Sequence, residues 1–85
     1  MSIKVLIVED KILVAEELSA DLEDDGFTVT DIAISSEECF TSIKENTPHV
    51  ILMDINIKGD NDGIETSAII NKTHHIPIIY LTANT

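Results

Sequence analysis

The sequence predicts an open α/β fold, in which a parallel sheet carries helices on both faces. Four short apolar runs alternate along the chain with three stretches whose apolar residues recur at helical spacing. Each stretch is long enough for the crossover of about a dozen residues that joins two parallel strands. Because such crossovers are right-handed, successive helices are expected to cover both faces of the sheet.

The first strand and helix are the clearest elements. Residues 3–8 form an apolar run rich in β-branched side chains, which is typical of a strand buried on both faces. From Lys11 to about Asp25 an apolar stripe recurs every three or four residues, which predicts an amphipathic helix; its members are Ile12, Ala15, Leu18 and Leu22. Gly26 is expected to end this helix in a left-handed conformation. Residues 27–33 alternate and predict a second strand at a sheet edge.

The middle of the chain predicts a second helix and a third strand. Ser35 and Glu38 have the spacing of a capping box and are expected to open the helix. The helix should stop before Thr47 and Pro48, because the residue before a proline disfavours helical backbone. Residues 50–53 are an apolar run that predicts the third strand, which ends at Asp54.

A polar loop over residues 56–63 is expected before the third helix. Asp62 and Glu65 again have capping-box spacing, and the helix should run from about Ile64 to Asn71. Residues 76–81 predict a fourth strand with a proline near its start, where the missing N–H is tolerated. Residues 1–85 are therefore interpreted as a single domain.

Composition and charge narrow the classes of partner. The chain has five lysines, no arginine and sixteen acidic residues, which gives a formal net charge of −11. Direct binding to nucleic acid or to an anionic membrane is not expected, because both depend on clustered basic residues. No apolar run approaches the roughly 20 residues that cross a bilayer. Without a signal-peptide pattern at the N-terminus, a cytoplasmic location is expected. The lone Cys39 is interpreted as a small buried hydrophobe.

Polar side chains follow three of the predicted strands. Glu9 and Asp10 follow the first strand, Asp54 ends the third, and Thr82 follows the fourth. Ligands of open α/β sheets bind at the carboxyl ends of strands, where the chain reverses its direction of winding. If that reversal lies between the first and third strands, three carboxylates converge on one pocket.

Such a cluster requires a counter-ion. Two carboxylates about 4 Å apart repel by about 4 kcal/mol at an effective dielectric constant of about 20. Protonation of one acid or binding of a cation relieves this repulsion. Oxygen ligands without a nearby histidine or cysteine favour a hard ion, and Mg²⁺ fits best. A carboxylate beside Mg²⁺ can attack phosphorus and form an aspartyl phosphate.

These residues resemble the receiver domains of two-component response regulators over the whole chain. The similarity is carried by Val8-Glu9-Asp10, by Met53-Asp54, by residues 62–65 and by residues 76–83. The resemblance implies a flavodoxin-like open parallel sheet with strand order 2-1-3-4. It also implies that Asp54 accepts a phosphoryl group from a phosphohistidine on a histidine kinase or a phosphotransfer protein.

Further roles follow from the same resemblance. Asp10 would be the more direct Mg²⁺ ligand, and Glu9 would act through water. Asn56 would offer its backbone carbonyl to the metal, and Thr82 would be the switch hydroxyl that moves toward the phosphoryl group. Gly63 matches a turn position after the loop. Lys58 and Gly59 stand where many members have proline, and Lys58 is interpreted as an exposed loop residue.

One departure from the family bears on the chemistry. The family has a lysine at the end of a fifth strand, whereas no lysine follows Lys72 here. By this comparison the chain lacks the last strand and the last helices. The fourth strand would then be an apolar edge. Two expectations follow as alternatives: either the natural chain continues beyond Thr85, or this chain associates with itself through that strand or through an uncovered face of the sheet.

Other functions remain as alternatives. The main one is a receiver that is not phosphorylated and acts as a dimerisation or docking module. A dehalogenase-type phosphohydrolase also uses a strand-end aspartate, but it needs a second aspartate where Asn56 stands, so substrate turnover is not expected. A nucleotide- or flavin-binding module is disfavoured, because the first turn has no glycine-rich phosphate cradle.

Overall fold

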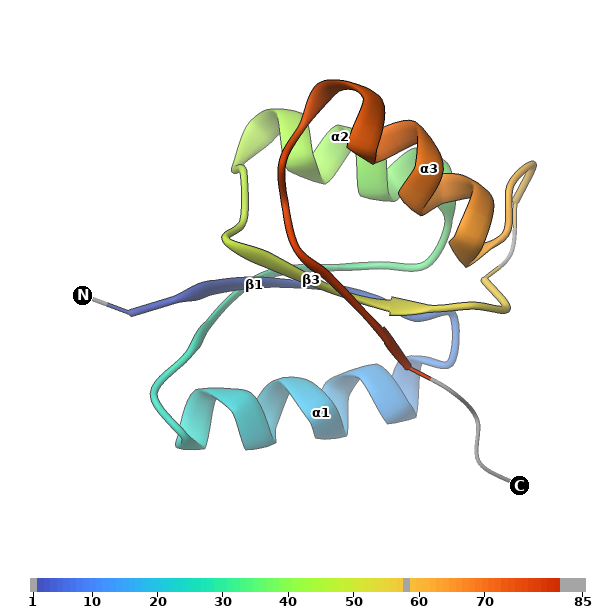
Figure 1. The fold of residues 1–85 in the computed structure, drawn as a ribbon. Coiled ribbons are helices and arrows are strands. Elements are labelled where there is room, and N and C mark those ends of the chain that lie inside the picture. Colours follow the sequence, from blue (N-terminus) through green and yellow to red (C-terminus); the bar gives the residue numbers. More distant parts are fainter. Residues whose placement is uncertain (1, 58, 82–85) are drawn as a thin grey trace.

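The computed structural model describes residues 2–57 and 59–81, which form a three-layer α/β structure (Figure 1). Within these residues, four parallel strands form one sheet in the order β2-β1-β3-β4. The strands are β1 (Lys4–Val8), β2 (Thr28–Ala33), β3 (Val50–Asp54) and β4 (Ile78–Leu81). The helices are α1 (Ile12–Asp24), α2 (Ser36–Glu45) and α3 (Gly63–Thr73). The predicted element order and the predicted strand order are confirmed.

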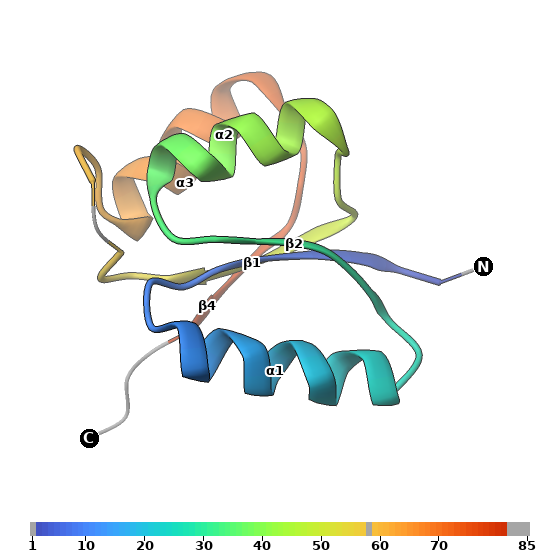
Figure 2. The same cartoon turned by 180° about the vertical axis from the view of Figure 1, so that it is seen from behind.

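The helices divide between the two faces of the sheet. Helix α1 covers one face, and α2 and α3 lie together on the other (Figure 1). The view from behind places β2 at the edge opposite β4 (Figure 2). The expectation of helices on both faces is therefore confirmed, and β2 is an edge strand as its alternating pattern predicted.

Alternation along the central strands divides the core into two clusters. Leu6 and Val8 of β1 pack with Met53 of β3 in the cluster on the α2 and α3 face. Val5 and Ile7 of β1 pack in a smaller cluster on the α1 face. Successive side chains of a strand point to opposite faces, so an apolar run such as β1 supplies both clusters. This double burial holds the end of β1 in a fixed position.

Two helix starts show how well the capping predictions hold. At α3, Asp62 Oδ1 accepts from the Glu65 N–H at 2.9 Å, and Glu65 Oε1 accepts from the Asp62 N–H at 2.9 Å. This complete capping box confirms the prediction. At α2, Ser35 Oγ accepts from the Glu38 N–H at 3.2 Å, but Glu38 Oε1 accepts from the Ile34 N–H. Only half of the predicted box is therefore present at α2.

Three further details differ from the sequence prediction. Ile12 is 47 % exposed and belongs to neither core cluster, so it is not a core residue. Strand β4 begins at Ile78 and not at Ile76; the Pro77 carbonyl still accepts from the Ile51 N–H at 3.0 Å. Ile57 is buried in the core, although it lies in a loop that was predicted to be polar.

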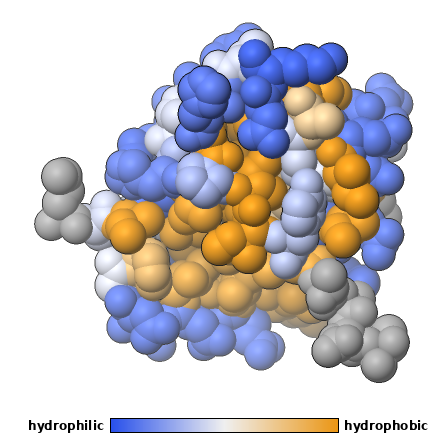
Figure 3. Space-filling view, viewed as in Figure 1, coloured by the Kyte–Doolittle hydropathy of each residue, from blue (hydrophilic) through white to orange (hydrophobic). Residues whose placement is uncertain are grey.

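Apolar side chains also reach the surface along β4. Among the described residues β4 pairs only with β3, and Ile79 and Tyr80 are 55 % and 42 % exposed. The space-filling view shows hydrophobic surface gathered over the sheet, between α1 on one side and α2 and α3 on the other (Figure 3). None of the helices in the described part of the chain is both long and apolar enough to span a bilayer.

Candidate functional site

The carboxyl ends of β1 and β3 lie side by side. The two strands pair in register, with Val8 opposite Met53, so the residues that follow them emerge at the same edge of the sheet. In the sheet, β2 lies on one side of β1 and β3 lies on its other side, so the direction of winding reverses at β1. This reversal places a crevice at the ends of β1 and β3, as the rule for open α/β sheets requires.

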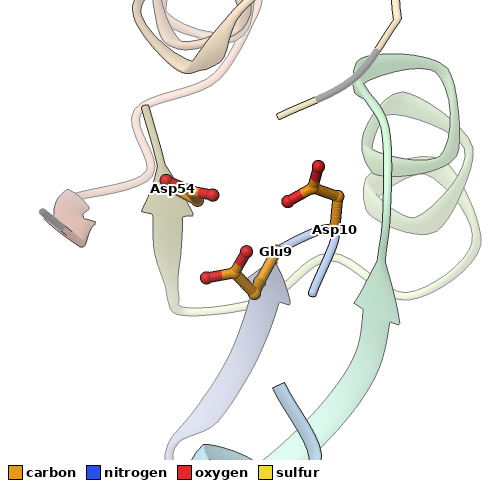
Figure 4. Close-up of side chains that lie close together, drawn as sticks. All are labelled: Glu9, Asp10 and Asp54. Atoms are coloured by element: carbon orange, nitrogen blue, oxygen red, sulfur yellow. The ribbon is translucent and has the colours of Figure 1, made fainter. Parts of the chain in front are cut away.

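Three carboxylates meet at this crevice. One oxygen from each of Glu9, Asp10 and Asp54 lies within 4.8 Å of the other two. Glu9 and Asp54 are only 6 % and 5 % exposed, and Asp10 is half-buried. The close-up shows the three side chains turned toward a common space from two neighbouring strand ends (Figure 4). The predicted convergence of these residues is therefore observed.

Backbone donors orient two of the carboxylates. Glu9 Oε2 accepts from the Lys11 N–H at 3.1 Å. Asp54 Oδ1 accepts from the Asn56 N–H at 3.1 Å. The Glu9 N–H donates to the Ala33 carbonyl at 2.9 Å, which ties the first acid to the end of β2. These bonds fix the rotation of both side chains while leaving each carboxylate with oxygen lone pairs for another ligand.

Burial and the neighbouring acids make the charged form of Glu9 unfavourable. Burial raises the pKa of Glu9 from 4.5 to about 7, and the neighbouring carboxyls of Asp54 and Asp10 add to this increase. The hydrogen bond from the Lys11 backbone acts in the opposite direction without offsetting it. A buried carboxylate with a raised pKa is destabilised in its charged form, so a cation at this point would stabilise the cluster.

The donor set fits a hard divalent ion. All three side chains offer oxygen, and no sulfur or imidazole belongs to the cluster of described residues. Mg²⁺ is held in proteins by one or two carboxylates and keeps several of its waters, which suits a half-open crevice. The residues therefore fit the Mg²⁺ site that the sequence predicted.

A groove of about 430 Å³ leads away from the acidic cluster along the α1 face of the sheet. Glu9 and Asp54 line it where it meets the cluster. Val14, Leu18 and Leu81 supply apolar walls, and Lys11, Glu17 and Asp21 supply further charged groups. The carboxyl groups of Glu9 and Asp54 are therefore buried but remain accessible from this side.

The structure corrects the reading of Gly63. The residue was interpreted as a turn position, yet it is the first residue of α3 and its φ is not positive. A Cβ at Gly63 would lie 2.2 Å from the Asp54 carbonyl oxygen and 2.7 Å from the Ile55 Cα. The glycine is required because the backbone of the predicted phosphoacceptor passes directly against it.

Of three other residues singled out in the sequence, the structure describes only Asn56. Asn56 is exposed, and its N–H bonds to Asp54, while the use of its carbonyl as a metal ligand stays a prediction. Thr82 and Lys58 lie outside the described residues. The buried Ile57 was missed, although one apolar residue inside a polar loop is a signal that could have identified it.

Comparison with known proteins agrees with this geometry. A sequence model of the response regulator receiver domain matches residues 5–85. The signal receiver domain of a modulated diguanylate cyclase from Desulfovibrio desulfuricans G20 is 35 % identical, with a TM-score of 0.89 over 96 % of this chain and 66 % of that chain. The N-terminal domain of a response regulator/sensory box/GGDEF protein from Carboxydothermus hydrogenoformans is 35 % identical, with a TM-score of 0.88 and the same coverage.

A third match is the anti-anti-sigma factor PhyR from Bartonella quintana, solved in complex with the anti-sigma factor NepR. It is 31 % identical, with a TM-score of 0.87 over 100 % of this chain and 35 % of that chain. The chain thus spans between about a third and two thirds of the length of these three structures. Sequence model, sheet order and acidic crevice agree, and the chain belongs to the response regulator receiver domain family.

Proposed function

We propose that this chain is a phosphoacceptor switch that takes a phosphoryl group onto Asp54 in the presence of Mg²⁺. The observation that carries the proposal is the convergence of Glu9, Asp10 and Asp54, whose oxygens lie within 4.8 Å of one another. Membership of the receiver family supports the same role. The chain would itself carry the phosphoryl group as a signal, and it would not turn over a separate substrate.

The proposed metal ligands come from both strand ends. Asp10 and Asp54 would bind Mg²⁺ directly, Glu9 would act through water, and Asn56 would offer its backbone carbonyl. The chemistry that Mg²⁺ supplies at such a site is neutralisation of the negative charge on the transferring phosphoryl group. The pKa of Glu9, which burial and the neighbouring carboxyls raise, is consistent with this assignment, because a nearby cation would stabilise the charged form of Glu9.

The transfer step is a displacement at phosphorus. A carboxylate oxygen of Asp54 attacks the phosphorus of a phosphohistidine on a histidine kinase or phosphotransfer protein. The new P–O bond forms as the P–N bond breaks, and the imidazole leaves with the electron pair and takes up a proton. The hydrogen bond from the Asn56 N–H holds the attacking carboxylate in orientation. Thr82 is proposed to donate a hydrogen bond to the bound phosphoryl group.

Incubation with a small acyl phosphate tests this function without a partner kinase. With Mg²⁺, the chain is expected to gain the mass of one phosphoryl group, in an adduct that alkali removes. With a chelator in place of Mg²⁺, the adduct should not form. A chain that stays unmodified at saturating Mg²⁺ and donor would contradict the proposal and favour a docking module.

The second candidate, a dimerisation or docking module, rests on the apolar surface along β4. Ile79 and Tyr80 are exposed on a strand that pairs only with β3 among the described residues. Such a strand is a template for pairing with another chain. The matched PhyR structure contains an anti-sigma factor, and the net charge of −11 here likewise favours a protein partner over nucleic acid.

Light scattering tests self-association through β4. The unsubstituted chain is expected to have a concentration-dependent mass above that of a monomer, and Ile79→Lys should shift it toward the monomer, because a charge on an edge strand opposes pairing. Ile64→Lys, which changes an equally exposed isoleucine on α3, is the matched control and should leave the mass unchanged. A cooperatively folded monomer at every concentration would contradict self-association.

A further inference from the structure

The first residue of α3 lies against the backbone of Asp54. A Cβ built at Gly63 would be 2.2 Å from the Asp54 carbonyl oxygen, 2.7 Å from the Ile55 Cα and 3.0 Å from the Asp54 carbonyl carbon. Its neighbours are main-chain atoms and not the flexible end of a side chain, so they cannot rotate away. Any side chain at this position must displace either the start of α3 or the end of β3.

One bond joins the start of α3 to the turn after Asp54, and further bonds within the helix and its cap make that start rigid. The Gly63 N–H donates to the Ile55 carbonyl at 2.8 Å, which joins the helix directly to the turn after Asp54. Ser67 Oγ donates to the Gly63 carbonyl at 2.8 Å, and Ser67 is buried. The complete capping box of Asp62 and Glu65 fixes the residue before Gly63. The helix start therefore has little freedom to yield.

The turn after Asp54 is held on its other side by the core. Ile57 is 6 % exposed and belongs to the cluster that packs under α2 and α3. Asn56 lies between this anchor and Asp54, and its N–H bonds to the Asp54 carboxylate. The segment from Asp54 to Ile57 is thus fixed at one end by Gly63 and at the other by Ile57.

We propose that Gly63 is a positioning residue for Asp54. Because Gly63 has no side chain, the start of α3 can pack directly against the turn after β3. This contact keeps the Asp54 carboxylate within reach of Glu9 and Asp10. The inference rests on the proposed function, since it assigns the contact between α3 and the turn after β3 a role in metal binding and phosphoryl acceptance. Mg²⁺ requires near-ideal octahedral geometry at about 2.0–2.1 Å from each ligand. A Cβ at Gly63 would push the Asp54 backbone by about 1 Å to reach ordinary contact distance, which is a large error on that scale.

The test compares Gly63→Ala with Gly26→Ala. Gly26 follows α1 at the opposite end of the sheet, has φ +95°, and has nothing within 4 Å of an added Cβ. Its replacement strains the backbone without touching the site, so it controls for loss of stability. Titration with Mg²⁺ well below both melting temperatures is expected to give a Kd raised about tenfold or more for Gly63→Ala. Gly26→Ala should keep the Kd of the unsubstituted chain.

A gentler variant covers the case in which Gly63→Ala does not fold. Ser67→Ala removes only the bond to the Gly63 carbonyl, and it should raise the Kd by a smaller factor in a folded chain. If Gly63→Ala folds and binds Mg²⁺ as tightly as Gly26→Ala, the positioning role is overturned. If only Ser67→Ala can be measured, an unchanged Kd overturns it.

A metal-free readout separates this inference from the proposed function. In NMR spectra without Mg²⁺, Gly63→Ala should shift the amide signals of Glu9, Asp10 and Asn56. Ser67→Ala serves in its place if Gly63→Ala does not fold. Gly26→Ala should leave these signals unmoved. If the unsubstituted chain binds no Mg²⁺, the proposed function fails, and these shifts alone decide whether Gly63 positions Asp54. Unmoved amide signals would then overturn the inference.

Discussion

Asp54→Asn is expected to abolish the phosphoryl adduct completely. The amide oxygen of asparagine is a poor nucleophile, and the variant also removes one of three converging negative charges. The side chain keeps its shape and an oxygen that can accept from the Asn56 N–H, so the local structure should persist. Mass spectrometry after incubation with Mg²⁺ and an acyl phosphate measures the loss.

Asp60→Asn is the matched control for this variant. Asp60 is an exposed acid in the loop after β3, and it lies outside the cluster of three carboxylates. Its replacement changes the net charge by the same amount and should leave the adduct intact. An adduct that survives in Asp54→Asn and is lost in another acidic variant would place the acceptor elsewhere.

Glu9→Gln is expected to stabilise the metal-free chain at pH 8 by up to about 3 kcal/mol. Burial and the neighbouring carboxyls raise the pKa of Glu9 from 4.5 to about 7. Between these two values the folded chain keeps a proton that the unfolded chain releases, so the stability of folding falls as pH rises through this window. Glutamine carries no charge and can still accept from the Lys11 N–H, so the variant avoids this loss.

Urea unfolding from pH 4 to pH 8 without divalent ions measures this difference. The free energies of unfolding of Glu9→Gln and the unsubstituted chain should be similar at pH 4 and separate as pH rises toward 7. Glu16→Gln, on the exposed side of α1, is the control and should show no such separation. Equal stability of Glu9→Gln and the unsubstituted chain at pH 8 would show that Glu9 is not destabilised by its surroundings.

The sequence predicted the features that depend on local pattern and on strand ends. The apolar run of β1 placed Glu9 and Asp10 at its carboxyl end, and the run of β3 placed Asp54 beside them. Periodicity identified all the helices of the described region within a few residues, and spacing identified the capping box at α3. These predictions succeeded because strand direction and side-chain alternation follow from short stretches of sequence.

The features that failed depend on how the chain runs beyond the local pattern: for Gly63 and Ile57 on contacts with other segments, and for Glu38 on the path of the chain just before α2. The need for glycine at position 63 comes from the backbone of Asp54 and Ile55, which no pattern around Gly63 reveals. Ile57 packs into a core made largely by other strands and helices, so its polar neighbours gave a misleading signal. Glu38 bonds to Ile34 and not to Ser35, because the path of the chain before α2 decides which N–H is within reach.

Calorimetric titration with Mg²⁺ at pH 8 tests most directly whether Asp10 and Asp54 contribute to one metal site. Saturable binding of one ion per chain is expected, with strong weakening in both Asp10→Asn and Asp54→Asn and none in Asp60→Asn. Because the first two residues come from different strands, parallel losses would require that both side chains reach the same ion. No saturable binding by the unsubstituted chain, or unchanged binding in either site variant, would contradict the site and with it the phosphoacceptor role.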